Sequence, residues 1–343
     1  MKVHVANMKI IAQLLIKKNA NAMLQYLIIL LDDSSVSYCH YDSTYTNPRI
    51  IDISNLKAGI KFAMKENLMI QFVYPNYNIP SEYKDVIESI DHSKIIPSSS
   101  PLVNNADVIV FNDWRELVEN NVDVTSTCVL RICKKDLFAQ VGRIKTYIDK
   151  LSRLNIVITD TQTFSESDIH LYQDVIRQLR EEIEQLFKVG KSPQLNIITD
   201  RIALTKMNNC NAGYNNITLA PDGKFYVCPA FYYDEEDKES FCIGSLQDGL
   251  NIKAANLYKL PYAPLCRNCD AYQCKRCVWI NRKMTYDITT PSHEQCVIAH
   301  IERNGSREVL ENVRKSKDFY PEQVINELNY LDPYDVRVDW HKI

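Results

Sequence analysis

The amino-terminal part of the chain alternates short apolar runs with stretches of helical periodicity. Residues 26–31 (YLIILL) form a continuous apolar run, a pattern typical of a strand buried on both faces. Similar runs predict further strands at residues 68–74, 107–111, 127–132, 156–158 and 195–198. Helical spacing of apolar residues predicts helices at residues 56–66, 83–90, 114–120 and 137–154. A longer helix is predicted to begin after Ser165 or Ser167 and to end at Gly190.

Strands that alternate with helices predict a mostly parallel α/β sheet. The repeats fall short of the eight of a closed barrel, so we expect a partial (β/α) barrel. After Asp200, cysteines, turns and short strands replace this alternation, and we place a domain boundary near Thr205. The sequence thus predicts an α/β domain at residues 1–204, a small cysteine-rich domain at 205–302 and a helical tail at 303–343. Helices are expected in the tail at residues 306–315 and 322–330.

The overall composition narrows the class of protein. Of the 343 residues, 45% are hydrophobic and 24% are charged, and the formal net charge of −3 provides no basic field for nucleic acid. No stretch has the roughly 18 consecutive apolar residues of a membrane helix, and residues 1–22 lack a secretory layout. We therefore expect a cytoplasmic protein with neither nucleic acid nor membrane as a partner. In that reducing compartment, clustered cysteines more often bind metal than form disulfides.

Eight of the 11 cysteines are concentrated between residues 210 and 296. We predict all eight as metal ligands: Cys210, Cys228, Cys242, Cys266, Cys269, Cys274, Cys277 and Cys296. Four of them form two Cys-x-x-Cys pairs, whose turns let two sulfurs converge on one metal, and Arg267, Lys275 and Arg276 add positive charge that favours thiolates. Such pairs are also typical of a structural zinc ribbon. The four residues between Cys269 and Cys274 are fewer than a zinc ribbon usually has, which leaves open that the pairs serve different centres.

A hairpin is predicted upstream of these pairs. Residues 217–219 and 224–227 flank the turn sequence Ala-Pro-Asp-Gly at 220–223. Cys228 follows the second strand of this hairpin and Cys210 precedes the first. The hairpin is therefore expected to bring two sulfurs that are distant in sequence to one end.

The order Cys210-x12-Gly223-x4-Cys228, followed by the two pairs and Cys296, resembles the SPASM domain of radical S-adenosylmethionine peptide-modifying enzymes. The resemblance implies a partial barrel of radical-SAM type followed by a SPASM-like domain. It also implies one [4Fe–4S] cluster held by Cys210, Cys228 and Cys277, with Cys242 as the candidate fourth ligand. A second cluster would be held by Cys266, Cys269, Cys274 and Cys296. Cys269 and Cys274 are one residue closer than in the usual SPASM spacing, so one or two clusters are expected.

The loop after the first strand departs from this pattern. Radical S-adenosylmethionine enzymes carry Cys-x3-Cys-x2-Cys there, whereas this loop holds only Cys39, and the usual Gly-Gly-Glu after the second strand is replaced by residues 72–75 (FVYP). One thiol cannot hold a cluster with an open iron, so S-adenosylmethionine is not expected as a cofactor. The combination resembles the CXXX repeat peptide maturase family, whose members lack the catalytic cluster motif but retain SPASM cysteines.

This resemblance implies a non-radical iron–sulfur subunit in the maturation of a ribosomally made, cysteine-containing peptide. Its expected partners are the precursor peptide and a radical S-adenosylmethionine enzyme. Two alternatives stay open. Cys39 and His40, at the carboxyl end of a strand, are candidate catalytic residues of an independent peptide-modifying enzyme. The cysteines could otherwise hold zinc in an interaction protein without catalysis.

Overall fold

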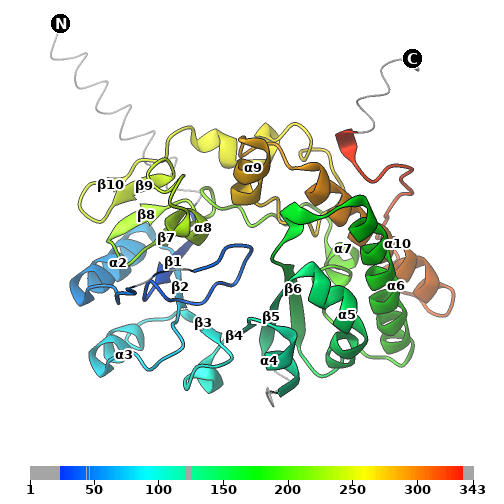
Figure 1. Cartoon of the computed structure of the whole chain (residues 1–343), viewed down its shortest axis with the longest axis horizontal. Helices are drawn as coiled ribbons and strands as arrows, with labels where there is room; N and C mark the ends of the chain where they lie inside the picture. Colours follow the sequence, from blue (N-terminus) through cyan, green and yellow to red (C-terminus); the bar gives the residue numbers. More distant parts are fainter. Residues whose placement is uncertain (1–23, 44, 46, 120–125, 335–343) are drawn as a thin grey trace, which may run out of the picture.

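One mixed sheet organises the protein. The structure is a computed structural model that describes residues 24–43, 45, 47–119 and 126–334. Ten strands of this described part form the sheet in the order β10-β9-β8-β7-β1-β2-β3-β4-β5-β6. Six neighbouring strands run parallel in chain order: β1 (Tyr26–Leu30), β2 (Met69–Val73), β3 (Ser93–Pro97), β4 (Val108–Phe111), β5 (Thr127–Ile132) and β6 (Arg153–Ile158). The predicted α/β class with a large parallel sheet is therefore confirmed (Figure 1).

Two strand predictions need correction. Strand β3 was not expected, because only Ile95 and Ile96 are apolar within it and Pro97 ends it. The predicted strand at residues 195–198 is wrong, since Leu195 forms only an isolated parallel bridge with Leu154 before a helix begins. An apolar run of four residues can be buried beside a sheet edge without extending the sheet.

Helices connect the parallel strands: α2 (Ile53–Glu66), α3 (Ser81–Ile87), α4 (Trp114–Glu119), α5 (Lys134–Ile144), α6 (Glu166–Lys188) and α7 (Thr199–Ala203). Short 3₁₀ turns occur at η1 (Val103–Asn105), η2 (Lys145–Tyr147) and η3 (Thr161–Thr163). Helix α6 begins where one of the two predicted caps placed it. The Ser165 side chain accepts from the Asp168 backbone N–H, and the Asp168 carboxylate accepts from the Ser165 N–H.

The cysteine-rich part continues the same sheet. Strand β7 (Asn216–Leu219) lies parallel to β1, and β8 (Lys224–Tyr226), β9 (Cys242–Ser245) and β10 (Gly249–Leu250) follow in antiparallel order. The predicted hairpin is confirmed. Leu27, Leu219 and Phe225 share one hydrophobic core, so the two halves are packed together. The boundary at Thr205 stays a prediction. It was placed where cysteines and turns replace the α/β alternation, and the sheet continues across both parts of the chain.

The remaining helices are α8 (Pro229–Tyr233), α9 (Val278–Thr285) and α10 (His293–Arg314), with 3₁₀ turns η4 (Ala255–Tyr258) and η5 (Leu260–Tyr262). Helix α10 begins earlier than the predicted tail helix at 306–315 and packs along α6 (Figure 1). The predicted helix at 322–330 is wrong, because these residues form no helix. Within the described part of the chain, each helix is too short or too polar to span a bilayer.

Helix α2 packs against the strand pair that joins the two halves. Its buried residues Leu56, Gly59, Ile60 and Ala63 recur at helical spacing. A Cβ atom at Gly59 would overlap the buried Leu219 side chain of β7. This close approach of α2 and β7 therefore depends on glycine, which has no side chain, at position 59.

We predict that Gly59→Ala lowers the free energy of unfolding by about 1–3 kcal/mol, because it overpacks the core between α2 and β7. Gly142→Ala is the matched control, since its Cβ would meet no atom within 4 Å on helix α5. That variant should gain roughly 0.5–1 kcal/mol from helix propensity. Urea unfolding followed by circular dichroism measures both, and equal stability of Gly59→Ala and the wild type would contradict the packing described.

Candidate metal centres

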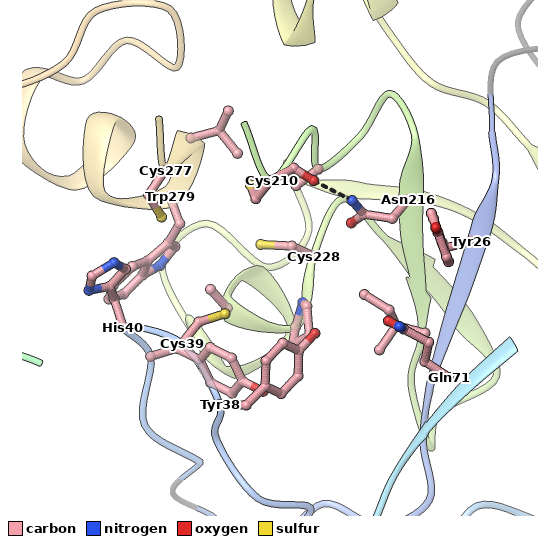
Figure 2. Close-up of a pocket in the computed structure, with 16 residues that line it drawn as sticks. Tyr26, Tyr38, Cys39, His40, Gln71, Cys210, Asn216, Cys228, Cys277 and Trp279 are labelled. Atoms are coloured by element: carbon pink, nitrogen blue, oxygen red, sulfur yellow. Dashed lines mark hydrogen bonds between the residues drawn. The ribbon is translucent and has the colours of Figure 1, made fainter. Parts of the chain in front are cut away.

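Four cysteines from distant parts of the chain line one cavity of about 290 Å3. They are Cys39, Cys210, Cys228 and Cys277. Figure 2 shows their four sulfur atoms facing a common space. Three of them are the set that the sequence resemblance implied for one cluster. The fourth, Cys39, comes from the loop after β1.

Helix ends orient two of these sulfurs. Cys228 is the N-cap residue of α8, with Pro229 at the first helical position, and Cys277 is the N-cap residue of α9. Burial raises the pKa of both thiols, and backbone N–H groups in the first turn of each helix oppose this shift, although neither sulfur accepts a cap hydrogen bond of full geometry. Such donors stabilise a thiolate and are typical of iron–sulfur ligands.

A second cavity, of about 30 Å3, is lined by the other predicted group: Cys266, Cys269, Cys274 and Cys296. The Ala271 N–H lies 3.4 Å from the Cys269 sulfur, and His300 Nε2 lies 3.5 Å from the same sulfur. Cys274 belongs to this group although Cys277, three residues later, belongs to the first. The structure thus separates the second Cys-x-x-Cys pair between two cavities, as the interleaved ligand sets implied.

Cys242 joins neither cavity. It lies on β9, packs beside a core cluster that contains Ile28 and Tyr226, and its Sγ lies 3.6 Å from the Gly244 carbonyl oxygen. Its predicted place beside Cys210, Cys228 and Cys277 is therefore taken by Cys39. Each of the 11 cysteines is a free thiol.

Burial dominates the acidity of the grouped thiols. It raises the pKa of Cys277 to about 12 and that of Cys266 to about 11. At Cys266 the positive charge of Arg276 opposes this shift only in part. The basic residues are therefore a smaller influence than the sequence suggested. Metal binding at these sites must release protons from the thiols.

Three buried guanidinium groups lie near the second group of cysteines: Arg276 lines the second cavity, and Arg201 and Arg303 bond Asp270, next to Cys269. Arg201, Arg276 and Arg303 are each at most 3% exposed. The Asp270 carboxylate accepts hydrogen bonds from Arg303 at 2.6 and 2.8 Å and from Arg201 at 3.4 Å. Within the described residues, Nε and Nη1 of Arg201 and of Arg276 have no hydrogen-bond partner. Buried positive charge is costly without a counter-charge, so an anionic metal–thiolate centre fits this surrounding.

The sizes of the two cavities separate the candidate metals. Tetrahedral zinc, with Zn–S bonds of about 2.3 Å, requires its sulfurs to lie roughly 3.8 Å apart. Across the described ranges, no three His, Cys, Asp or Glu side chains are gathered closely enough to hold a single ion. The first cavity is also many times the ~10–15 Å3 that one water needs. It fits a multi-atom cluster, whereas the narrower second cavity suits either a cluster or zinc by volume.

A polar cavity of about 400 Å3 lies at the carboxyl ends of the parallel strands. Ser34, Ser37, Asn76, Asn112 and Arg131 are among the residues that line it, and no cysteine does. The Ser37 hydroxyl is buried without a partner in the described part of the chain. Sequence reasoning missed Arg131, because it stands as one polar residue in the apolar strand β5. A charged residue inside a buried strand was the available signal.

The two candidate catalytic residues face the cysteines. Cys39 lines the first cavity and not the polar one, and burial raises its pKa. His40 Nδ1 lies 2.9 Å from the Ile158 carbonyl oxygen, and burial lowers the pKa of its ring. Neither residue has the exposed, thiolate-favouring surroundings of a reactive cysteine site.

Glu302 lies between the two cysteine groups. The Tyr172 hydroxyl donates to Glu302 Oε1 at 2.7 Å, and Gln273 Nε2 donates to Oε2 at 3.4 Å. A third cavity, of about 130 Å3, is lined by Glu302 together with Cys274 and Cys277. Burial raises the pKa of Glu302 to about 7. The carboxyl group therefore holds its proton in the folded chain at pH values where the unfolded chain has lost it.

Comparison with known proteins places the fold. No protein-family model matches the chain, and no curated protein matches it. The solved structure "Native anSMEcpe with bound AdoMet" aligns with a TM-score of 0.57 and 11% identity, over 85% of this chain and 100% of that chain. "Native anSMEcpe with bound AdoMet and Cp18Cys peptide" aligns with a TM-score of 0.57 and 12% identity, over 85% and 99%. The chain thus has a fold like that of these two AdoMet-bound structures over most of its length.

We predict that Glu302 alone lowers the free energy of unfolding of the metal-free protein by up to about 1.4 kcal/mol per pH unit as the pH rises from ~4.5 to ~7. The unfolded chain loses the Glu302 proton near the lower value, whereas the folded chain keeps it to about 7, so stability is lost as pH rises. Glu302→Gln should remove this contribution. Denaturant unfolding of both proteins at several pH values tests it, and parallel pH profiles would contradict the assignment.

Proposed function

We propose that this protein is a non-radical, SPASM-type iron–sulfur subunit that acts in the maturation of a ribosomally made, cysteine-containing (CXXX repeat) peptide. One observation carries the proposal. Two groups of four cysteines surround two cavities, while the strand-end loop that would hold a radical cluster has a single cysteine.

The donor sets favour iron–sulfur clusters. Four thiols, backbone donors directed at several of the sulfurs, and buried guanidinium groups suit an anionic cluster. We propose that the second centre is held by Cys266, Cys269, Cys274 and Cys296. In the first, Cys210, Cys228 and Cys277 supply three ligands. Bound clusters would supply one-electron transfer and would stabilise the segments that they cross-link.

The region where S-adenosylmethionine would bind lacks the means to activate it. Three thiolates are needed to hold a cluster with one open iron, and the loop after β1 has only Cys39. After β2, the Tyr74 side chain is buried, and the backbone carbonyl of Tyr74 accepts a hydrogen bond from the Val36 N–H at 3.0 Å. That stretch of backbone is thus already bonded internally. We propose that a separate radical S-adenosylmethionine enzyme supplies any radical step.

A peptide is the proposed ligand. The anSMEcpe structure with Cp18Cys peptide shows that a protein of this fold binds AdoMet and a peptide. The polar cavity at the strand ends offers hydroxyl, amide and guanidinium groups that can bond a peptide backbone. We therefore propose that the precursor peptide enters there, beside the loop that carries Cys39.

Zinc is the second candidate, and the small volume of the second cavity favours it there. A zinc-stabilised interaction protein would need the same cysteines without redox chemistry. The alternative of an independent enzyme with Cys39 as nucleophile is less favoured, because this half-buried thiol faces three others and its pKa is raised.

We predict that anaerobically purified and reconstituted protein holds about eight iron and eight sulfide per chain, four for each cluster. The double variant Cys269→Ala/Cys296→Ala should lose roughly half of both, because it removes two of the four ligands of the second centre alone. Cys128→Ala, a buried cysteine of β5, is the matched control. Stoichiometric zinc without iron or sulfide in the wild type would refute the iron–sulfur proposal.

We further predict that the iron-loaded protein binds a synthetic peptide of Cys-x-x-x repeats yet forms no 5′-deoxyadenosine from S-adenosylmethionine under reducing conditions. Fluorescence anisotropy measures binding and chromatography measures the nucleoside. Arg131→Gln should weaken binding about tenfold or more, because it removes a charged donor from the polar cavity. Production of 5′-deoxyadenosine above background would refute the non-radical assignment, and unchanged affinity of Arg131→Gln would refute the peptide site.

A further inference from the structure

We infer that Cys39 is the fourth thiolate ligand of the first centre, so that the loop after β1 closes a cluster of the cysteine-rich half. This inference rests on the iron–sulfur centre proposed above. Cys39 lines the cavity together with Cys210, Cys228 and Cys277, and its sulfur faces the same space as theirs (Figure 2).

The rival fourth ligand is placed elsewhere. Cys242 lines neither cysteine cavity, and its Sγ lies against the Gly244 carbonyl on β9. Gly244 has a φ of +133° and packs against the backbone of β10, so this segment cannot shift toward the cavity without disrupting the β9–β10 pair. A resemblance by cysteine order alone would select the wrong sulfur.

The loop around Cys39 is held from three sides. The buried Arg131 of β5 donates to the Cys39 carbonyl at 3.0 Å and to the Tyr41 carbonyl at 2.7 Å. His40 Nδ1 lies 2.9 Å from the Ile158 carbonyl, at the end of β6. Tyr41 stacks on Tyr233 of α8, with ring centroids 5.4 Å apart and planes 10° from parallel.

These anchors act on residues 39, 40 and 41, and they come from three different elements. They fix the loop in place around the sulfur, which is the support that a metal ligand requires. Tyr233 belongs to α8, whose N-cap residue is Cys228. The contact between Tyr41 and Tyr233 therefore also fixes the proposed ligands Cys39 and Cys228, from opposite halves of the chain, relative to each other.

His40 is the remaining competitor, because it lines the same cavity. Its Nδ1 is bonded to the Ile158 carbonyl, which leaves Nε2 as the ring nitrogen that could reach a metal. A thiolate is the ligand that iron–sulfur clusters use most, and Cys39 supplies one at the same wall. We therefore assign the ligand to Cys39 and make His40 an arm of the test.

With four thiolates the first centre has no open iron. It cannot bind substrate or S-adenosylmethionine through the metal, and its role is to carry an electron or to hold the two halves together. Cys39 then serves the cysteine-rich half, whereas Ser37 and Asp42 of the same loop line the polar cavity.

The test compares full-length wild type with Cys39→Ala, Cys242→Ala, His40→Gln and Cys133→Ala, all reconstituted anaerobically with iron and sulfide. Cys133 is the matched control, a free thiol at the start of α5 outside both cavities. Iron is counted after brief mild oxidation, and electron paramagnetic resonance detects three-iron clusters. We expect Cys39→Ala alone to lose about one iron per chain and to show a three-iron signal. An added small thiol should suppress both changes.

Cys39→Ser covers the case in which the alanine variant misfolds. Its hydroxyl can stay bound to iron, so we expect full iron content with an altered cluster absorption spectrum. Wild-type iron content and spectra in both Cys39 variants would overturn the inference, as would the three-iron signal in Cys242→Ala or His40→Gln. A wild type that holds no iron would instead refute the proposed function itself, which keeps the two failures distinguishable.

Discussion

The pairing of β1 with β7 is the interaction on which the rest of the structure depends. It joins Tyr26–Leu30 to Asn216–Leu219, two segments from opposite halves of the sequence. Because the pairing is parallel, the loop after β1 and the turn after β7 leave the sheet at the same edge. Strand β8 then runs back antiparallel to β7, so Cys228 lies near the amino ends of β7 and β1, where Tyr26 and Asn216 line the first cavity together with Cys39. Without this register Cys39 and Cys228 would have no reason to meet.

Charge is the second constraint on the cysteine-rich half. Arg201, Arg276 and Arg303 are buried where a domain of this kind normally has apolar side chains. Asp270 neutralises part of their charge and lies directly after the proposed ligand Cys269. The ion pairs of Asp270 thus hold the segment beside the Cys269 sulfur in place. Part of the positive charge of the three arginines remains to balance thiolates of the proposed metal centre. In the proposed iron–sulfur centres, metal loading is expected to be coupled to the folding of this half.

Sequence patterns predicted the parallel sheet and the hairpin, because period and turn chemistry are local properties, whereas the resemblance to the SPASM domain implied the grouping of the seven cysteines that line the two cavities with Cys39. They missed β3, whose apolar content is only Ile95 and Ile96. They also missed the first half of α10, because buried polar residues such as His300 and Arg303 interrupt its apolar face. The exchange of Cys242 for Cys39 was not predictable from spacing, since it follows from which strands become neighbours in the sheet.

The central position of β1 has a consequence for synthesis. Its other neighbour, β2, emerges from the ribosome early, whereas β7 follows only after about 140 further residues have been made. During that interval one edge of a fully apolar strand, YLIIL, stays unpaired and open to association with other chains. A nascent chain arrested before Asn216 would be aggregation-prone, and loading of the first centre must wait until the ribosome has passed Cys277.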